Sequence, residues 1–381
     1  MEAAPIRRYL DNAATSWPKP EPVLAAWNHA ARMVGAAAGR AAYRSAVEAD
    51  AIRQRARMAA ARLLGGVDPA RVALPGGCTL ALNLAIHGLV RPGDHVIATA
   101  ADHNAVLRPL HALARRGIAE LTIVPCDGLG RVDPAAVAAA WRPATRLVAC
   151  THASNVTGAV QDVAAIAAIA HDRGGILLVD AAQTLGQISL DVATLGADLV
   201  AAPAHKWLHG TAGVGLLWAR AGIEPEPLVQ GGTGTRSESL DMPAAFIDSM
   251  EPGTPDVPAL AALVAADAWL RDRGLAATGA SCRGLAAECA ARLGALAGVR
   301  VLAAEGAPIV SFTVEGYDPG EVAVLLEQAA GVEVRSGFHC AACVHEHLGT
   351  AAGGTVRASF GPGNDRTDID AIVRVVETIR G

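Results

Sequence analysis

The run Ile176-Leu177-Leu178-Val179-Asp180 ends on an acid, and Ala197-Asp198-Leu199-Val200-Ala201 is followed by Pro203-Ala204-His205-Lys206. Both runs are almost continuously apolar, which is typical of parallel strands that are buried on both faces of a sheet. Open α/β sheets bind their ligands at the carboxyl ends of such strands. The sequence therefore predicts that Asp180 and Lys206 point into one crevice.

An acid and a lysine at one crevice suit the cofactor pyridoxal 5'-phosphate. This cofactor needs a lysine amine that holds its aldehyde as a Schiff base, and a carboxylate that keeps its ring nitrogen protonated. The alternative interpretation is a surface lysine and an unrelated Asp at the end of a strand.

The composition narrows the class of protein. The chain has 381 residues, of which 52% are hydrophobic and 18% charged, and no apolar run reaches the roughly 18 residues of a membrane span. We see no apolar segment of a secretory signal after the first residues, so we expect a cytoplasmic protein. The net charge of −5 and the lack of a basic stripe argue against nucleic acid as a partner. Seven cysteines without a secretory signal do not suggest a disulfide framework.

The pattern along the chain predicts an α/β fold. From about residue 71 to 218, short apolar strands alternate with helical segments, which indicates a mostly parallel sheet with helices on both faces. After residue 256, two alanine-rich helical stretches at 258–273 and 281–296 precede strand-like runs at 309–314, 332–335 and 355–360. We therefore predict an N-terminal arm (1–20) that packs near the small domain, a large domain (21–255) and a smaller α+β C-terminal domain (256–381).

Other polar residues follow strands of the same predicted sheet. The turn Pro75-Gly76-Gly77-Cys78-Thr79 opens a helix, whose free N–H groups and dipole suit a phosphate. His103 and Asn155 follow two further strands, and Gln183 lies three residues beyond Asp180. Several strand ends thus direct polar groups at one place.

Together these residues resemble the class V aminotransferase family of fold-type I pyridoxal-phosphate enzymes, and within it the SufS-like group of cysteine desulfurases. The resemblance rests on Tyr9-Leu10-Asp11-Asn12-Ala13-Ala14-Thr15, Asp102-His103-Asn104, Ser154-Asn155, Val179-Asp180-Ala181-Ala182-Gln183, His205-Lys206 and Val334-Arg335-Ser336-Gly337-Phe338-His339-Cys340-Ala341. It spans nearly the whole chain and implies the fold-type I architecture.

The resemblance also implies roles for single residues. Lys206 would hold the cofactor's aldehyde, Asp180 its ring nitrogen and Gln183 its hydroxyl, while His103 would stack on the ring and take part in catalysis. The phosphate would be bound by Thr79 and His205, with Cys78 and Asn155 as further cofactor contacts. Thr254, in the segment Glu251-Pro252-Gly253-Thr254-Pro255, resembles a residue lent to the neighbouring subunit's phosphate site, which implies a homodimer with shared active sites.

The sulfur chemistry is implied by the cysteine loop. Cys340 would be the nucleophile that takes sulfur from L-cysteine as a persulfide, releasing L-alanine, and His339 and Arg335 favour its thiolate. Arg357 would grip the substrate carboxylate, with Asn155 and Asn12 as further substrate contacts. An acceptor thiol or acceptor protein would then take the sulfur.

Two residues depart from the family pattern. Pro203 stands where relatives usually have a Ser or Thr that donates to the phosphate, and Cys78 replaces a common Thr. Fewer phosphate contacts and weaker cofactor binding follow from these changes.

Three alternatives stay open at this point. The run from His339 to His347 contains Cys343, His345 and His347 besides Cys340, which also suits a zinc or redox site. Cys343 could resolve a persulfide on Cys340 or simply pack. The protein could also be another class V enzyme, such as a selenocysteine lyase, C-S lyase, aminotransferase or epimerase in which Cys340 is not essential, or a non-catalytic sulfur carrier or assembly scaffold with this fold. We predict no metal at the pyridoxal site.

Overall fold

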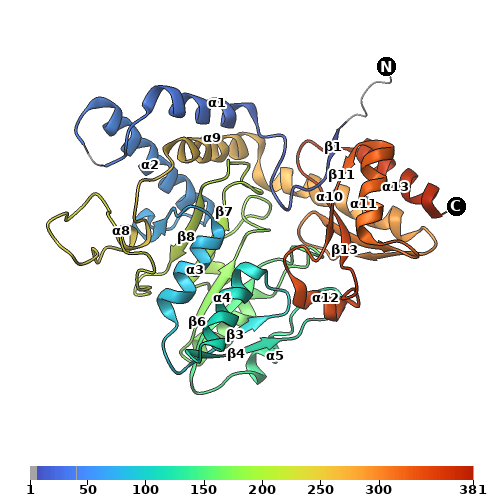
Figure 1. Cartoon of the computed structure of the whole chain (residues 1–381), viewed down its shortest axis with the longest axis horizontal. Helices are drawn as coiled ribbons and strands as arrows, with labels where there is room; N and C mark the ends of the chain where they lie inside the picture. The colour runs from blue at the N-terminus through green and yellow to red at the C-terminus, as the bar shows by residue number, and fades with distance from the viewer. Residues whose placement is uncertain (1–6, 40, 381) are drawn as a thin grey trace.

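The two apolar runs that end at Asp180 and Pro203 form neighbouring parallel strands in the middle of a seven-stranded sheet (Figure 1). The computed structural model describes residues 7–39 and 41–380. In spatial order the strands are β2 (Val72–Ala73), β8 (Gly215–Ala219), β7 (Leu199–Pro203), β6 (Ile176–Asp180), β5 (Thr145–Thr151), β3 (Asp94–Thr99) and β4 (Ala119–Val124). Only β8 runs against its neighbours. The predicted mostly parallel sheet is confirmed.

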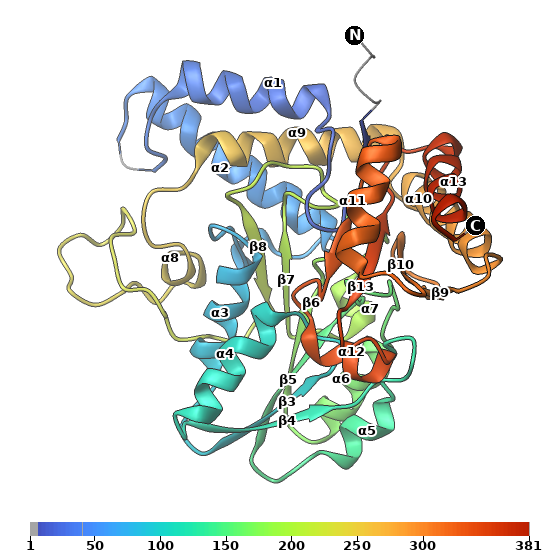
Figure 2. The ribbon, with the colours of Figure 1, turned by 45° about the vertical axis from the view of Figure 1, so that its right-hand side comes forward.

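Helices cover both faces of this sheet (Figure 2). They are α1 (Glu21–His29) with the π-helical turn η1 (Ala30–Val34), α2 (Arg44–Leu63), the 3-10 turn η2 (Pro69–Arg71), α3 (Cys78–Leu89), α4 (Asn104–Arg115), α5 (Pro134–Ala139), α6 (Val163–Asp172), α7 (Val192–Leu195), α8 (Phe246–Met250) and α9 (Val257–Arg273). Alternate residues of one strand enter opposite cores, as the period of two requires. Leu177 and Val179 of β6 pack with α2, α6 and α9, whereas Leu178 packs with α3 and α4.

The small domain is built on an antiparallel sheet in the order β12 (Arg335–Gly337), β13 (Thr355–Ser359), β10 (Ile309–Val314) and β9 (Val299–Leu302). Its helices are α10 (Leu275–Gly294), α11 (Pro319–Ala330), α12 (Ala342–Leu348) and α13 (Arg366–Arg380). Apolar residues of α10, α11 and α13 form one core with this sheet. The α+β character expected for the C-terminal part is confirmed.

The N-terminal arm reaches from the small domain to the large one. Its strand β1 (Arg8–Tyr9) pairs with β11 (Val332–Glu333), and Leu10 enters the core of the small domain. The predicted single strand at 332–335 is therefore split, because Val332 and Glu333 pair with the arm while Arg335 pairs with Arg357 of β13.

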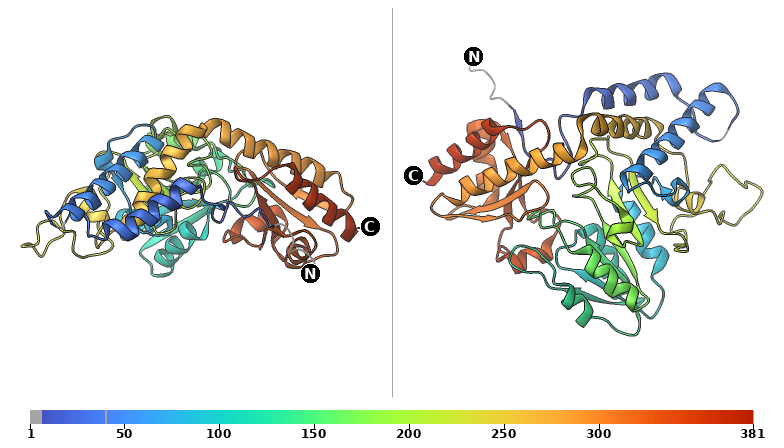
Figure 3. Two further views of the ribbon diagram at one scale, coloured as in Figure 1. Left: turned by 90° about the horizontal axis from the view of Figure 1, so that it is seen from above. Right: turned by 180° about the vertical axis from the view of Figure 1, so that it is seen from behind.

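The domain boundary expected near residue 256 stays a prediction. Helix α9, which begins just after it, contributes Leu260, Leu263 and Leu270 to the core of the large domain. Figure 3 shows α9 and α10 running one after the other from the large domain into the small one. The change from one core to the other therefore falls at Gly274, between these two helices. Within the described residues, no helix is both long and apolar enough to cross a bilayer.

Candidate active site

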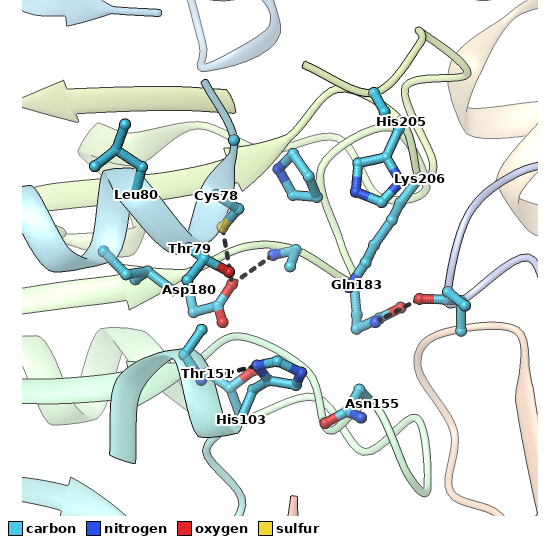
Figure 4. A pocket seen from close by; sticks show the side chains of 18 of the residues that line it. Cys78, Thr79, Leu80, His103, Thr151, Asn155, Asp180, Gln183, His205 and Lys206 are labelled. Carbon is cyan, nitrogen blue, oxygen red and sulfur yellow. Dashed lines mark hydrogen bonds between the residues drawn. The ribbon is translucent and has the colours of Figure 1, made fainter. Parts of the chain in front are cut away.

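A cavity of about 770 Å³ opens at the carboxyl ends of the parallel strands, where the two domains meet. Figure 4 shows its polar side chains. The structure brings together most of the predicted site residues in its wall, namely Cys78, Thr79, His103, Asn155, Asp180, Gln183, His205, Lys206 and Arg357. The convergence follows from the topology, because β3, β5, β6 and β7 are parallel and all end at this edge.

Asp180 presents one carboxylate oxygen that has no hydrogen-bond partner within residues 7–39 and 41–380. Its Oδ1 accepts a hydrogen bond from the Ala182 N–H at 2.9 Å and a long one from the Cys78 thiol at 3.9 Å. Burial raises the pKa of Asp180, and the positive charge of Lys206 opposes that rise. The carboxylate is thus held through Oδ1, which leaves Oδ2 to meet a protonated ring nitrogen.

Lys206 lies opposite Asp180 in the same cavity (Figure 4). Burial lowers the pKa of its amine, while the nearby Asp180 carboxylate raises it. A lysine with a lowered pKa has more of the uncharged amine that condenses with an aldehyde.

The glycine turn provides an anion site at one end of the cavity. Helix α3 begins at Cys78, and its N-cap, Gly77, has φ +149° and no side chain to cap the first turn. The N–H groups of this turn therefore stay available, and the helix dipole favours a negative charge here. Behind the turn, a Cβ on Gly215 would lie 2.4 Å from the Gly77 carbonyl carbon, so only glycine fits.

Two histidines of the cavity are held in the neutral form. His103 is the N-cap of α4, and its Nδ1 accepts a hydrogen bond from the Ala105 N–H at 3.0 Å, so the other ring nitrogen carries the proton. Burial, helped by Lys206, lowers the pKa of His103 from 6.5 to about 4. Burial and Lys206 do the same for His205, whose pKa is also about 4. Both rings can donate one hydrogen bond at neutral pH.

The backbone carbonyl that precedes Lys206 is unusually well bound. The oxygen of His205 accepts hydrogen bonds from Thr15 Oγ1 at 3.0 Å, Ser16 N at 3.0 Å, Ser16 Oγ at 3.2 Å and Lys19 Nζ at 2.7 Å. These donors all belong to the N-terminal arm. The arm therefore fixes the peptide unit that carries Lys206, which the sequence did not reveal.

Gln183 and Asn155 have partners of their own. Gln183 donates to the Ala13 carbonyl at 3.1 Å and accepts from Trp207 Nε1 at 2.8 Å, which sets the plane of its amide. Asn155 donates through Nδ2 to the carbonyl of His339 at 2.7 Å. Each amide retains one N–H for a ligand in the cavity.

Arg357 lies in the wall as a fixed guanidinium. It is 1% exposed, its Nη2 lies 2.6 Å from Asp11 Oδ1, and its Nη1 donates to the Asn155 carbonyl at 2.9 Å. Its buried Nε has no hydrogen-bond partner among the described residues. An unpaired buried donor beside a cavity favours a carboxylate ligand. Asp11, whose carboxylate balances this arginine, belongs to the motif at 9–15 but was not among the predicted site residues.

The cysteine loop closes the cavity from the small domain. Both His339 (φ +50°) and Cys340 (φ +61°) have left-handed backbones, which non-glycine residues seldom adopt. The Cys340 thiol lies 3.1 Å from Arg335 Nη2, and both Arg335 and His339 line the cavity, whereas Cys340 itself does not. The Arg335 guanidinium thus donates a hydrogen bond to the Cys340 sulfur.

Two predicted contacts lie away from this cavity. Asn12 was expected at the substrate, but its amide donates to the Ser359 carbonyl at 2.9 Å and to Asn364 Oδ1 at 3.2 Å, which turns it toward the small domain. Thr254 lines an adjoining cavity of about 240 Å³ that shares the turn residue Gly76 with the first. The position of Asn12 therefore does not support the predicted contact with the substrate.

The alternative of a zinc site finds no support in the geometry. His339 Nε2 lies 2.9 Å from Thr355 Oγ1, and His345 Nδ1 lies 2.7 Å from Thr350 Oγ1. Across residues 7–39 and 41–380, the structure contains no group of three or more His, Cys, Asp or Glu side chains that could hold a metal ion.

The residues present fit pyridoxal phosphate. The free Oδ2 of Asp180, the uncapped first turn of α3 and the buried Lys206 amine match a ring nitrogen, a phosphate and an aldehyde. Pro203 also lines the cavity and offers no donor, as its sequence position suggested.

The chain is similar to known proteins over nearly its whole length. The aminotransferase class-V family profile matches residues 8–372. A probable cysteine desulfurase of Methanothermobacter thermautotrophicus is 34% identical over 98% of this chain and 94% of its own. The solved apo structure of a cysteine desulfurase from Thermococcus onnurineus superposes with a TM-score of 0.90 at 29% identity, over 98% of this chain and 94% of its own.

The cysteine desulfurase CsdA of Escherichia coli is also similar, with 30% identity over 97% of this chain and 93% of its own. Its solved structure, with an S-sulfonic acid, has a TM-score of 0.88 at 29% identity, over 97% and 94% of the two chains. With a family match over nearly its whole length and relatives above 30% identity, the chain belongs to the aminotransferase class-V family.

Proposed function

We propose that the protein is a pyridoxal-phosphate-dependent cysteine desulfurase, which converts L-cysteine to L-alanine and holds the sulfur as a persulfide on Cys340. The observation that carries this proposal is the thiol of Cys340, 3.1 Å from a cavity-lining arginine, on a loop that faces Lys206, Asp180 and Arg357. The similarity to named cysteine desulfurases supports the same reaction.

The cofactor would be held by residues already in place. Lys206 would bind its aldehyde, Asp180 Oδ2 its ring nitrogen and Gln183 its hydroxyl, while the first turn of α3, with Thr79, and His205 would bind its phosphate. When bound, pyridoxal phosphate supplies an aldehyde for the substrate amine and a ring that accepts the electron pair from Cα.

The remaining chemistry falls to side chains. The Lys206 amine would take the proton from Cα, and Arg357 would hold the substrate carboxylate through its unpaired Nε. The Cys340 thiolate would attack the substrate sulfur. A new S–S bond forms as the C–S bond breaks, the electron pair of that bond stays with carbon, and carbon is protonated to give alanine. A reduced thiol or an acceptor protein would then take the persulfide sulfur.

We also propose a homodimer with shared active sites. Thr254 is exposed in the single chain, and the glycine turn opens toward its cavity. Leu80, Leu228 and Val229 are apolar residues near these cavities, and they are 38%, 42% and 43% exposed. Covering them with a second subunit would remove that apolar surface from water. The cytoplasmic location stays a prediction.

Release of alanine from L-cysteine, with a thiol reductant present, tests the reaction. We expect Cys340→Ala to lower this release by at least about 100-fold. The matched control is Cys343→Ala, three residues away, which should keep near wild-type release. Equal release by wild type and Cys340→Ala would favour another class V enzyme in which that thiol is incidental. A protein that shows no absorbance band of bound cofactor, once cofactor has been added and the unbound excess removed, would favour a non-catalytic role.

A further inference from the structure

Two consecutive residues of the cysteine loop have backbones that only neighbouring contacts can hold. His339 and Cys340 have φ values of +50° and +61°, in the left-handed region that favours glycine. Non-glycine residues keep such a conformation only where the surrounding structure determines it. The contacts that hold this loop are therefore part of how the thiol is presented.

Each of the two strained residues has its carbonyl bound by the large domain. The His339 carbonyl accepts a hydrogen bond from the side-chain Nδ2 of Asn155 at 2.7 Å, and the Cys340 carbonyl accepts one from the backbone N–H of Asn104 at 2.7 Å. The loop is linked to the small domain through His339 Nε2, which lies 2.9 Å from Thr355 Oγ1. Asn155 is thus the one side chain of the large domain, among the described residues, that donates a hydrogen bond to either of these residues.

Asn155 also faces the reaction site. It is 6% exposed and lines the cavity together with Lys206 and Arg357, and its backbone carbonyl accepts from Arg357 Nη1 at 2.9 Å. One residue therefore contacts the arginine of the proposed substrate site through its backbone and the cysteine loop through its side chain.

We propose that Asn155 is a positioning residue for Cys340, whose amide holds the His339 carbonyl and so keeps the strained loop docked with its thiol beside Arg335. This inference rests on the proposed function in one respect, namely that Cys340 is the nucleophile. The docking itself is a property of the chain and is measured without cofactor or substrate.

The test is the rate at which iodoacetamide alkylates Cys340 in the cofactor-free protein, with every modified cysteine mapped by mass spectrometry. Asn155→Ala removes the donor, and the loss of a hydrogen bond worth about 1 kcal/mol corresponds to about a fivefold larger share of undocked loop, in which the reagent reaches Cys340 more readily and alkylates it up to about fivefold faster. Asn104→Ala is the matched control, because Asn104 holds the loop through its backbone N–H and should leave the rate unchanged. Asn155→Asp keeps the shape but places an acceptor against the carbonyl, and serves if the alanine variant does not fold.

The proposal is supported if the rate rises at Cys340 alone in the Asn155 variants, while the melting temperature and the rates at Cys126 and Cys343 stay at wild-type values. An unchanged or slower rate at Cys340 overturns it. A rise shared by all three thiols would also overturn it, because that result indicates general loosening. The alkylation rates do not depend on desulfuration. If the protein releases no alanine from L-cysteine, the docking role of Asn155 can therefore still be tested.

Discussion

Replacing Glu251 by Gln should destabilise the protein far more than a surface substitution of the same kind. Glu251 and Arg57 form a two-pronged ion pair, with distances of 2.7 and 3.0 Å, and their side chains are only 11% and 8% exposed. The same carboxylate accepts from the Leu74 N–H, and Arg57 also donates to the Val72 carbonyl. This pair connects α2, the short strand β2 and the segment that leads to Thr254.

The size of the stability loss depends on which interactions of the Glu251 carboxylate a glutamine side chain can still make. Its oxygen can still accept one or two of these bonds, but its NH₂ group faces the guanidinium and leaves a buried positive charge without a counter-charge. Breaking a buried ion pair by removing one partner costs about 3–5 kcal/mol. The retained acceptor puts the expected loss near the lower end, at about 3 kcal/mol, or a fall of about 4 °C in melting temperature for a chain of this length.

Chemical unfolding of the cofactor-free protein measures this loss, at one fixed concentration because the proposed homodimer would make stability depend on concentration. The control is Glu224→Gln, whose partner Arg71 lies at 2.8 Å but whose carboxylate side chain is 56% exposed. We expect that variant to lose at most about 1 kcal/mol. Equal losses in the two variants would refute the reasoning. The double variant Arg57→Met/Glu251→Met should recover much of the stability, because no charge is then left unpaired.

Three other outcomes follow from the structure. After addition of pyridoxal phosphate and reduction with borohydride, mass spectrometry should find the cofactor on the Lys206 peptide of the wild type and none on that peptide in Lys206→Ala. Arg357→Lys should lower kcat/KM for L-cysteine about 30- to 150-fold, mainly by raising KM, because one ammonium group replaces the planar guanidinium with its paired N–H donors. An unchanged KM would mean that the substrate carboxylate binds elsewhere. Burial lowers the pKa of His152 from 6.5 to about 4, so its unfolded form takes up a proton first as pH falls. The stability that neutral His152 contributes is fully present above about pH 6.5 and is lost toward pH 4, at up to about 1.4 kcal/mol per pH unit. Equilibrium unfolding at pH 7 and pH 5 measures this loss. The free energy of unfolding should fall less between these two pH values in His152→Asn than in the wild type.

The sequence was informative where chemistry follows directly from the order of strands. Asp180, Lys206, His103 and Asn155 each follow a parallel strand, and parallel strands that end at one edge must bring such residues together. The apolar runs and the glycine turn were therefore sufficient to predict the sheet and the wall of the cavity.

The contacts between the two domains could not be predicted from the order of the strands. The hydrogen bond from Asn155 to the His339 carbonyl joins residues 184 positions apart, and the ion pair of Arg357 with Asp11 joins residues 346 apart. Such pairs depend on how the small domain and the arm dock, which no local pattern encodes. The same reason explains why Asn12, one residue after Asp11, turns toward Ser359 instead of the cavity.

The N-terminal arm has a mechanical consequence. One end of the arm is anchored to the small domain, where Arg8 and Tyr9 pair with β11. The other end is anchored to the His205 carbonyl, which accepts hydrogen bonds from the side chains of Thr15, Ser16 and Lys19. Residues 11–15 between these anchors form a turn that is itself held to the small domain, because Asn12 donates to the Ser359 carbonyl at 2.9 Å and the Ala13 N–H donates to the Ser359 hydroxyl at 2.9 Å. The arm thus works as a short tether, so that any rotation of the small domain that lifts Cys340 from the cavity also pulls on the peptide unit of Lys206.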